Sequence, residues 1–209
     1  MSRNHFRDLS AGWQTIVMFG LLGLVFALVL AFVQPLRYGS TARLLIMQNI
    51  GTSTDAFTAS RSEERIAENL STIIYTSTFF DQVLNAGFEI NRDIFPSDDV
   101  KARRAWRRTV DATVARGSGL LTISAYHQDI RQAEQIVRAV AFVLTDRVAE
   151  FTSGNNVRVR IIDTPLNSRW PVKPNIPANI FSGFFLGAFM GIAYVMLQTE
   201  RLRRRHQLR

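Results

Sequence analysis

The residues of this chain that could do acid–base chemistry are few and scattered. His127 lies two residues before Asp129, and a histidine beside a carboxylate could serve as a general base. A lone histidine at the junction of a strand and a helix is more often a surface or capping residue, so we expect no catalysis from it. Two pairs of adjacent acids could form carboxylate dyads, but both lie at expected helix starts, where capping explains them: Asp98 with Asp99, and Glu63 with Glu64.

Other catalytic signatures are absent from the sequence. The chain has no cysteine, which excludes disulfides, zinc thiolate sites and thiol nucleophiles. It shows no phosphate-cradling glycine loop, no nucleophile elbow and no metal-ligand spacing. We therefore expect no enzyme activity, no cofactor and no metal, and we expect the function to lie in shape and assembly.

A basic stripe is the first candidate binding feature. In "FPSDDVKARRAWRRTV", Ser97 or Asp98 predicts a helix N-cap, and arginines four positions apart share one face of that helix. This face could hold an anionic polymer or lipid phosphates, or it could be a solvated face paired with acids on a neighbour. Its members are Arg103, Arg104, Arg107 and Arg108.

Prolines mark a second feature, the stretch "WPVKPNIPANI". It holds three of the six prolines of the chain at a spacing of three: Pro171, Pro174 and Pro177. Proline fixes φ and disfavours helix in the residue before it, so residues 170–179 are predicted to form an extended strap. The strap leads into an apolar run, which suggests a coupling role.

Two long uncharged runs predict membrane spans, at residues 13–33 and 180–197. Both match the roughly 17 to 25 residues that a helix needs to cross a bilayer. The alternatives are a buried core helix for either run and a cleaved signal peptide for the first. The second run carries two consecutive GxxxG motifs, Gly183, Gly187 and Gly191, along which another helix can approach closely. Gly20 and Gly23 of the first run, a neighbouring subunit or a partner protein could supply that helix.

Basic residues beside the spans predict their orientation. The tails at residues 1–12 and 198–209 are rich in arginine, so both termini are expected in the cytoplasm and the segment between the spans outside it. The net charge of +8 lies largely in these tails, because the middle segment holds 18 basic against 15 acidic residues. We attribute the excess to topology and to contact with membrane lipids, and we expect no nucleic-acid binding.

The segment at residues 34–169 predicts an α+β domain with a small mixed sheet and one long helix. A strand is expected over 38–47, and helices are expected from Ser60, from Thr76 or Ser77, and from Asp98. Apolar alternation on both sides of Gly117 predicts a hairpin. Asp129 with Gln132 forms a capping box that opens a long helix, which Gly154 would end, and a last strand follows.

Several of these stretches together resemble the Wzz-type polysaccharide co-polymerases, or chain-length determinants. "YGSTARLLI" is similar to the first strand of that family, and "TSTFFDQVLNAGFEI" is similar to one of its helices. "ISAYHQDIRQAEQIV" resembles its strand followed by the long helix. "TPLNSRWPVKPNIPANIFSGFFLGAFMGIAYV" resembles its proline signature and glycine-rich second span. The chain resembles a compact member without the long helical arm of the larger ones.

The resemblance implies a non-catalytic scaffold in the bacterial inner membrane, with a periplasmic or extracellular main domain. It implies a ring of identical subunits that regulates the chain length or export of a surface polysaccharide, such as O-antigen, capsule or exopolysaccharide. The implied partners are a polysaccharide polymerase or exporter and a separate cytoplasmic tyrosine kinase. The alternative is a two-span sensor or ligand-binding module that works with a cytoplasmic partner.

Overall fold

The computed structural model describes residues 12–48, 56–152 and 156–207. The chain divides into two compact units. We call Leu36–Val172 the sheet unit, and we call the part formed by Met1–Pro35 and Lys173–Arg209 the helix-pair unit. The predicted stop at Gly154 and the N-terminal arginines, Arg3 and Arg7, lie outside the described residues.

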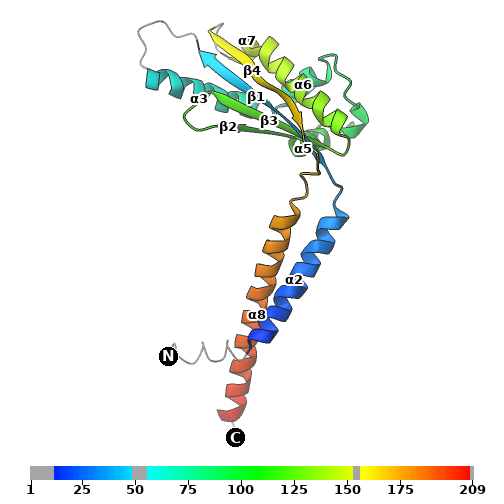
Figure 1. Ribbon diagram of the computed structural model, residues 1–209, viewed down its shortest axis with the longest axis vertical. Helices are drawn as coiled ribbons and strands as arrows, with labels where there is room; N and C mark the ends of the chain where they lie inside the picture. Colours follow the sequence, from blue (N-terminus) through cyan, green and yellow to red (C-terminus); the bar gives the residue numbers. More distant parts are fainter. Residues whose placement is uncertain (1–11, 49–55, 153–155, 208–209) are drawn as a thin grey trace. The chain divides into compact units, whose positions relative to one another are not determined.

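The helix-pair unit consists of α2 (Trp13–Val33) and α8 (Ile176–Gln207), which run side by side (Figure 1). Both helices are long and apolar enough to cross a membrane, with mean hydropathies of 3.0 for α2 and 2.0 for the apolar part of α8. Only 11% and 17% of the positions in their most apolar windows are buried. A core helix of a soluble protein would be mostly buried, so these helices are not core helices.

The sheet unit contains a four-stranded sheet in the order β2-β3-β1-β4. Its strands are β1 (Tyr38–Gln48), β2 (Val110–Val114), β3 (Leu120–His127) and β4 (Val157–Asn167). Every neighbouring pair is antiparallel, so the prediction of a mixed sheet is wrong. The reason is that β1 inserts between β3 and β4, which run in the same direction but never touch as neighbours. This is the connection order of a split β-α-β arrangement, which hosts many unrelated functions.

Helices cover one face of this sheet and bury a single hydrophobic core against it (Figure 1). Ala42, Leu44 and Ile46 of β1 point toward α6 because alternate residues of a strand share a face. The indole of Trp106 is fully buried beside the rings of Phe80 and Phe95, and it donates to the carbonyl of Ile74 at 2.7 Å. The helices of the unit are α3 (Ala56–Ile73), α4 (Ser77–Leu84), η1 (Arg92–Ile94), α5 (Asp99–Thr109), α6 (Ile130–Asp146) and α7 (Val148–Phe151).

Three predicted helix starts are confirmed by their caps. The side chains of Thr76, Asp98 and Asp129 each accept a backbone N–H in the first turn of α4, α5 and α6. These short polar side chains satisfy backbone donors that have no partner within the helix. The hairpin is also confirmed, and Gly117 adopts a positive φ of 70° in its turn.

Two predicted capping boxes are wrong. Ser60 lies inside α3, which begins four residues earlier, and its hydroxyl donates to the carbonyl of Gly117 at 2.8 Å. Gln132 does not fold back on its own cap, because its amide bridges to the main chain of Glu89 and Asn91. In both cases the polar side chain forms a hydrogen bond with a residue far along the chain, although the local pattern predicted a bond at the helix end.

The prediction of one long helix needs a correction as well. The periodic segment divides at Arg147 into α6 and α7, and Val148 beyond the break remains buried on the same side. α3, with 18 residues, is as long as α6, with 17. Apolar spacing alone shows neither fact, because it continues across the break and because α3 begins at Ala56, before the cap predicted at Ser60.

Candidate functional site

The glycines of α8 lie directly against α2. A side chain on Gly23 would overlap the carbonyl oxygen of Gly183 and lie 3.0 Å from the Cα of Gly187. A Cβ on Gly187 would overlap the carbonyl oxygen of Phe19, and one on Gly191 would lie 2.9 Å from the Cα of Ile16. The two backbones therefore touch along two turns, which only small residues permit. Of the three partners that the sequence allowed for this strip, the structure shows the helix of the same chain.

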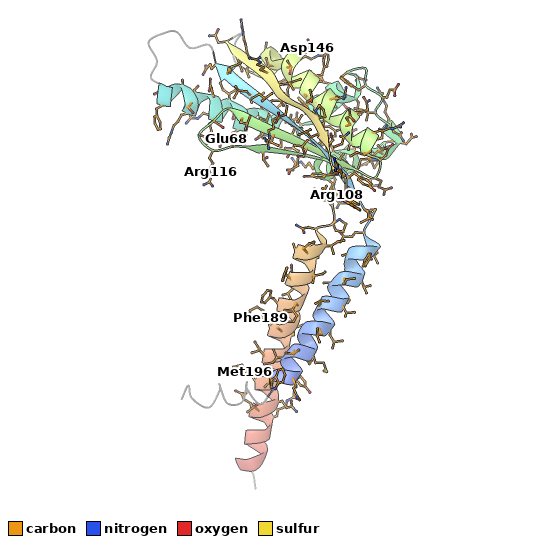
Figure 2. The ribbon with its side chains drawn as sticks, in the orientation of Figure 1. Glu68, Arg108, Arg116, Asp146, Phe189 and Met196 are labelled. Carbon is orange, nitrogen blue, oxygen red and sulfur yellow. The ribbon has the colours of Figure 1, made fainter. Side chains whose placement is uncertain are left out.

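Aromatic side chains flank this glycine contact. The rings of Phe19 and Tyr194 stack at 5.5 Å between centroids, and the edge of Phe184 lies over Gly20. Phe189 and Met196 project from the exposed side of α8 (Figure 2). Large apolar groups thus face outward while the smallest residues lie between the helices, as in helix pairs that pack within lipid.

The sheet unit is entered and left by the chain at one place. The N–H of Ser168 donates to the carbonyl of Gly39 at 2.8 Å, and the N–H of Gly39 donates to the hydroxyl of Ser168 at 2.9 Å. Beyond this pair, the N–H of Val172 donates to the carbonyl of Arg37 at 2.8 Å. The two connections therefore run as a paired ribbon, formed by residues 37–39 and 168–172, which we call the tether end.

The three prolines do not form one uniform strap. Pro171 lies in the tether end outside any helix, but Pro174 lies at a bend, so the prediction of an extended strap is wrong at Pro174. Pro177 is the second residue of α8, so the prediction is wrong for this residue and the helix begins at Ile176. Proline is tolerated in the first turn because the N–H that it lacks has no partner there.

The four predicted arginines lie on the exposed side of α5, opposite the buried residues Ala102, Trp106 and Thr109. Among the described residues, no carboxylate lies within 4 Å of their guanidinium groups. The described part of the chain therefore does not show the predicted alternative, in which these arginines pair with acids on a neighbouring element. Arg37 joins this group, because its Nη1 donates to the carbonyl of Arg108 at 3.4 Å.

The sheet face that carries no helix holds a shallow hollow of about 380 Å³ near the tether end. Thr41 and Arg43 line it from β1, Tyr126 lines it from β3, and Asp163 and Leu166 line it from β4. Arg43 and Asp163 form an ion pair at 3.6 Å across a register shift between β1 and β4. Sequence reasoning missed these residues, since strand alternation does not reveal where the register shifts.

One pair of the acids first considered for catalysis, and the histidine, have structural partners. Glu63 accepts the N–H of Gln48 at 3.2 Å, and Glu64 accepts the N–H of Gly117 at 3.0 Å. The Nδ1 of His127 accepts the N–H of Asp129 at 3.0 Å, so it supports the turn into α6. Within the described ranges, no three metal-ligating side chains cluster.

Three side chains of the sheet unit have shifted pKa values. Burial raises the pKa of Tyr75, whose hydroxyl accepts the N–H of Ala112 at 2.9 Å, and burial likewise raises the pKa of Tyr126. The amide of Asn167 donates to Glu134 at 2.7 Å, and this bond, with help from Arg138, lowers the pKa of that carboxyl. None of these groups forms a nucleophile–base pair.

Comparison with known proteins assigns no function to this chain. No protein-family model matches this chain, and no curated protein matches its sequence. The features available for a functional argument are therefore the glycine contact, the tether end, the exposed arginines of α5 and the hollow on the open sheet face.

Proposed function

We propose that this chain is a non-catalytic scaffold of a bacterial inner membrane that regulates the length or export of a surface polysaccharide, in the manner of the polysaccharide co-polymerases. The observation that carries the proposal is the way the domain is built around its two membrane connections. The strand that follows α2 and the strand that precedes α8 are neighbours, with Ser40 paired to Asn167. A domain held at two adjacent points suits a role in positioning other molecules.

Several features support an α2 that stays in the membrane and is not cleaved as a signal peptide. Gly20 and Gly23 contact α8 closely, so removal of α2 would expose the glycine strip of α8. The arginines of the two tails favour cytoplasmic termini and an extracytoplasmic sheet unit. A homo-oligomeric ring, a polymerase or exporter, and a separate cytoplasmic kinase are the partners of this proposal.

The test has a genetic and a biophysical arm. Deletion of the gene should change the length profile or the yield of the surface polysaccharide on a sizing gel, and an unchanged profile and yield would remove the proposal. The full chain in detergent or nanodiscs should form a high-order homo-oligomer by mass photometry. A clean monomer would contradict the ring even if the polysaccharide changed.

Replacing all three prolines by alanine tests whether the connection to α8 matters for function. We expect normal membrane insertion with an altered polymer length, because Pro171 and Pro174 stiffen the segment that joins the tether end to α8. The variant also carries Pro177→Ala, which changes the second residue of α8. Normal polymer length in this variant would show that the segment is a passive spacer.

The hollow on the open sheet face favours a second candidate, a two-span module that binds a small ligand. Its lining combines an arginine, a carboxylate and a tyrosine hydroxyl, Arg43, Asp163 and Tyr126, a polar set able to orient a small polar molecule. Substitution of Arg43 by alanine separates the candidates. An unaltered polysaccharide together with a lost response to a soluble ligand would favour the binding module.

A further inference from the structure

The exposed arginines of α5 are held close to the point where the chain enters the sheet unit. Arg37 lies four residues after Val33, the last residue of α2, and an extended chain covers at most about 3.6 Å per residue. Covalent connection alone therefore keeps Arg37 within about 14 Å of the end of α2. The side chain of Arg37 in turn reaches the last turn of α5, at the carbonyl of Arg108.

The surface at this end is cationic and unpaired. Within the described part of the chain, no carboxylate comes within 4 Å of the four α5 arginines, and the guanidinium of Arg107 lies 5.9 Å from the ring centre of Tyr75. Asp111 is the acid closest along the chain, and it lies near enough to Tyr75 to raise the pKa of that hydroxyl. Asp98 and Asp99 at the start of α5 are two further acids, and three carboxylates do not balance five arginines and Lys101, so the surface carries a net positive charge.

An exposed tryptophan accompanies these charges. Trp170 is 80% exposed, and it lies between the two residues of the tether end, Ser168 and Val172, that bond to the facing strand. The main chain around the indole is therefore held by hydrogen bonds while the ring itself faces outward. Tryptophan is enriched at the boundary between membrane and water because its ring is apolar and its N–H is polar.

We infer that the tether end and the exposed face of α5 form a contact surface for an anionic lipid bilayer, in which the four arginines bind headgroup phosphates and Trp170 lies at headgroup level. Two observations identify this partner. The arginines complement the negative charge of the lipid phosphates, and the covalent connection of Arg37 to α2 keeps the tether end within reach of the membrane that α2 enters. An anionic polysaccharide would be attracted by the same charges, and its sugar rings could stack on the indole, but no covalent connection holds a soluble polymer at this end of the sheet unit. This inference rests on the membrane assignment of α2 and α8, and it is independent of any role in polysaccharide assembly.

The test uses the full chain in nanodiscs of phosphatidylcholine, with and without about one third phosphatidylglycerol. Native mass spectrometry counts the lipids that stay bound after the protein is released from the nanodiscs. Brominated lipids quench the fluorescence of Trp170 when it lies near the bilayer, and Trp13→Phe removes the tryptophan at the start of α2. The remaining tryptophan, Trp106, is fully buried and serves as an unquenched reference. We expect several-fold enrichment of phosphatidylglycerol and stronger quenching in the anionic discs, because each basic residue near an anionic surface strengthens binding about fivefold.

Two variants with the same change in charge make the test specific. Replacing the four α5 arginines by glutamine should abolish both the enrichment and the extra quenching. Replacing four arginines at the other end of the sheet should leave both the enrichment and the extra quenching intact. The two ends can be located in Figure 2, where Arg108 precedes β2 and Arg116 follows it. This control set is exposed and has no ion pair among the described residues: Arg65, Arg116, Arg158 and Arg160.

The outcomes separate the possibilities. Equal effects of the two variants would overturn the inference, because they would show a response to total charge. Protection of the α5 surface by a soluble sulfated polysaccharide, without any response to phosphatidylglycerol, would also overturn it in favour of a polymer-binding surface. A chain that fails to enter the nanodiscs at all would instead refute the membrane assignment. Unchanged thermal unfolding of the glutamine variant would show that its effect is not a loss of fold.

Discussion

Replacing Gly187 by alanine tests whether α2 and α8 pair through their glycines. The added Cβ would overlap the carbonyl oxygen of Phe19 and lie 3.1 Å from the Cα of Gly20, where ordinary contacts begin at about 3.4 Å. Both neighbours are backbone atoms that cannot turn aside, so the helices must separate by roughly 1 Å to restore an ordinary contact. Each atom pair along the glycine strip then loses part of its attraction.

The expected cost follows from this overlap. Overpacking of a close contact costs typically 1–3 kcal/mol, so we expect about 2 kcal/mol, or roughly 30-fold in the equilibrium between paired and separated helices. The greater helix propensity of alanine does not offset this, because both helices keep their backbone hydrogen bonds in lipid even when they separate. Leucine at Gly187 should cost more than alanine, since its whole side chain has no space.

Cysteine cross-linking measures the pairing directly, because the natural chain has no cysteine. Cysteines in place of Phe19 and Tyr194, whose rings lie 5.5 Å apart, should cross-link with a short bis-maleimide while the helices are paired. A titration with SDS then gives the midpoint at which cross-linking is lost. Ala193 is exposed on α8, so Ala193→Leu is the control that adds volume without touching α2. An unchanged midpoint for both Gly187 variants would refute close packing through the glycines.

Three further predictions concern the sheet unit. Trp106→Phe should lower its free energy of unfolding by about 2–4 kcal/mol, as a buried carbonyl loses its donor and a cavity opens, measured by urea unfolding of the full chain in detergent. Glu134→Gln should destabilise at neutral pH, and the difference from wild type should shrink as the pH falls through the lowered pKa of Glu134, because that lowered pKa confers stability only while the carboxyl is charged. Val172→Pro removes the N–H that bonds Arg37 and should increase hydrogen exchange in the first residues of β1.

Each of these has an outcome that would contradict it. A loss below 0.5 kcal/mol for Trp106→Phe would mean that the indole bond is not formed. A Glu134→Gln effect that does not shrink as acid protonates the carboxyl would assign it to packing and not to charge. Unchanged exchange in Val172→Pro would show that the tether end is held by the Gly39–Ser168 pair alone.

Much of the local structure follows from the sequence, because short-range physics decides it. Asp98, Asp129 and Thr76 cap helices through bonds that span only two or three residues, and such caps are visible in the residue pattern. The hairpin at Gly117 is equally local, since a turn needs its positive φ. The apolar character of α2 and α8 is a matter of composition alone, and it predicts helices long enough to span a membrane.

What the residue pattern could not decide depends on partners far along the chain. Ser60 bonds across 57 positions to Gly117, and this contact, not a cap, explains its polar side chain. The antiparallel sheet arises because β1 lies between β3 and β4, a choice that no local signal records. The ribbon that joins Arg37 to Val172 and the approach of Arg37 to Arg108 likewise exist only in the folded chain.

The sequence by itself determined the two apolar spans, the separation of charge toward the tails, and the presence of a glycine strip, because composition and spacing suffice for these. Only the tertiary structure decided which helix the strip contacts, and that the arginines of α5 lie beside the entry of the chain without a carboxylate partner in the described ranges. The physical reason is that a side chain's type limits which interactions it can make. Its actual partner depends on which distant backbone the fold brings within a few ångströms.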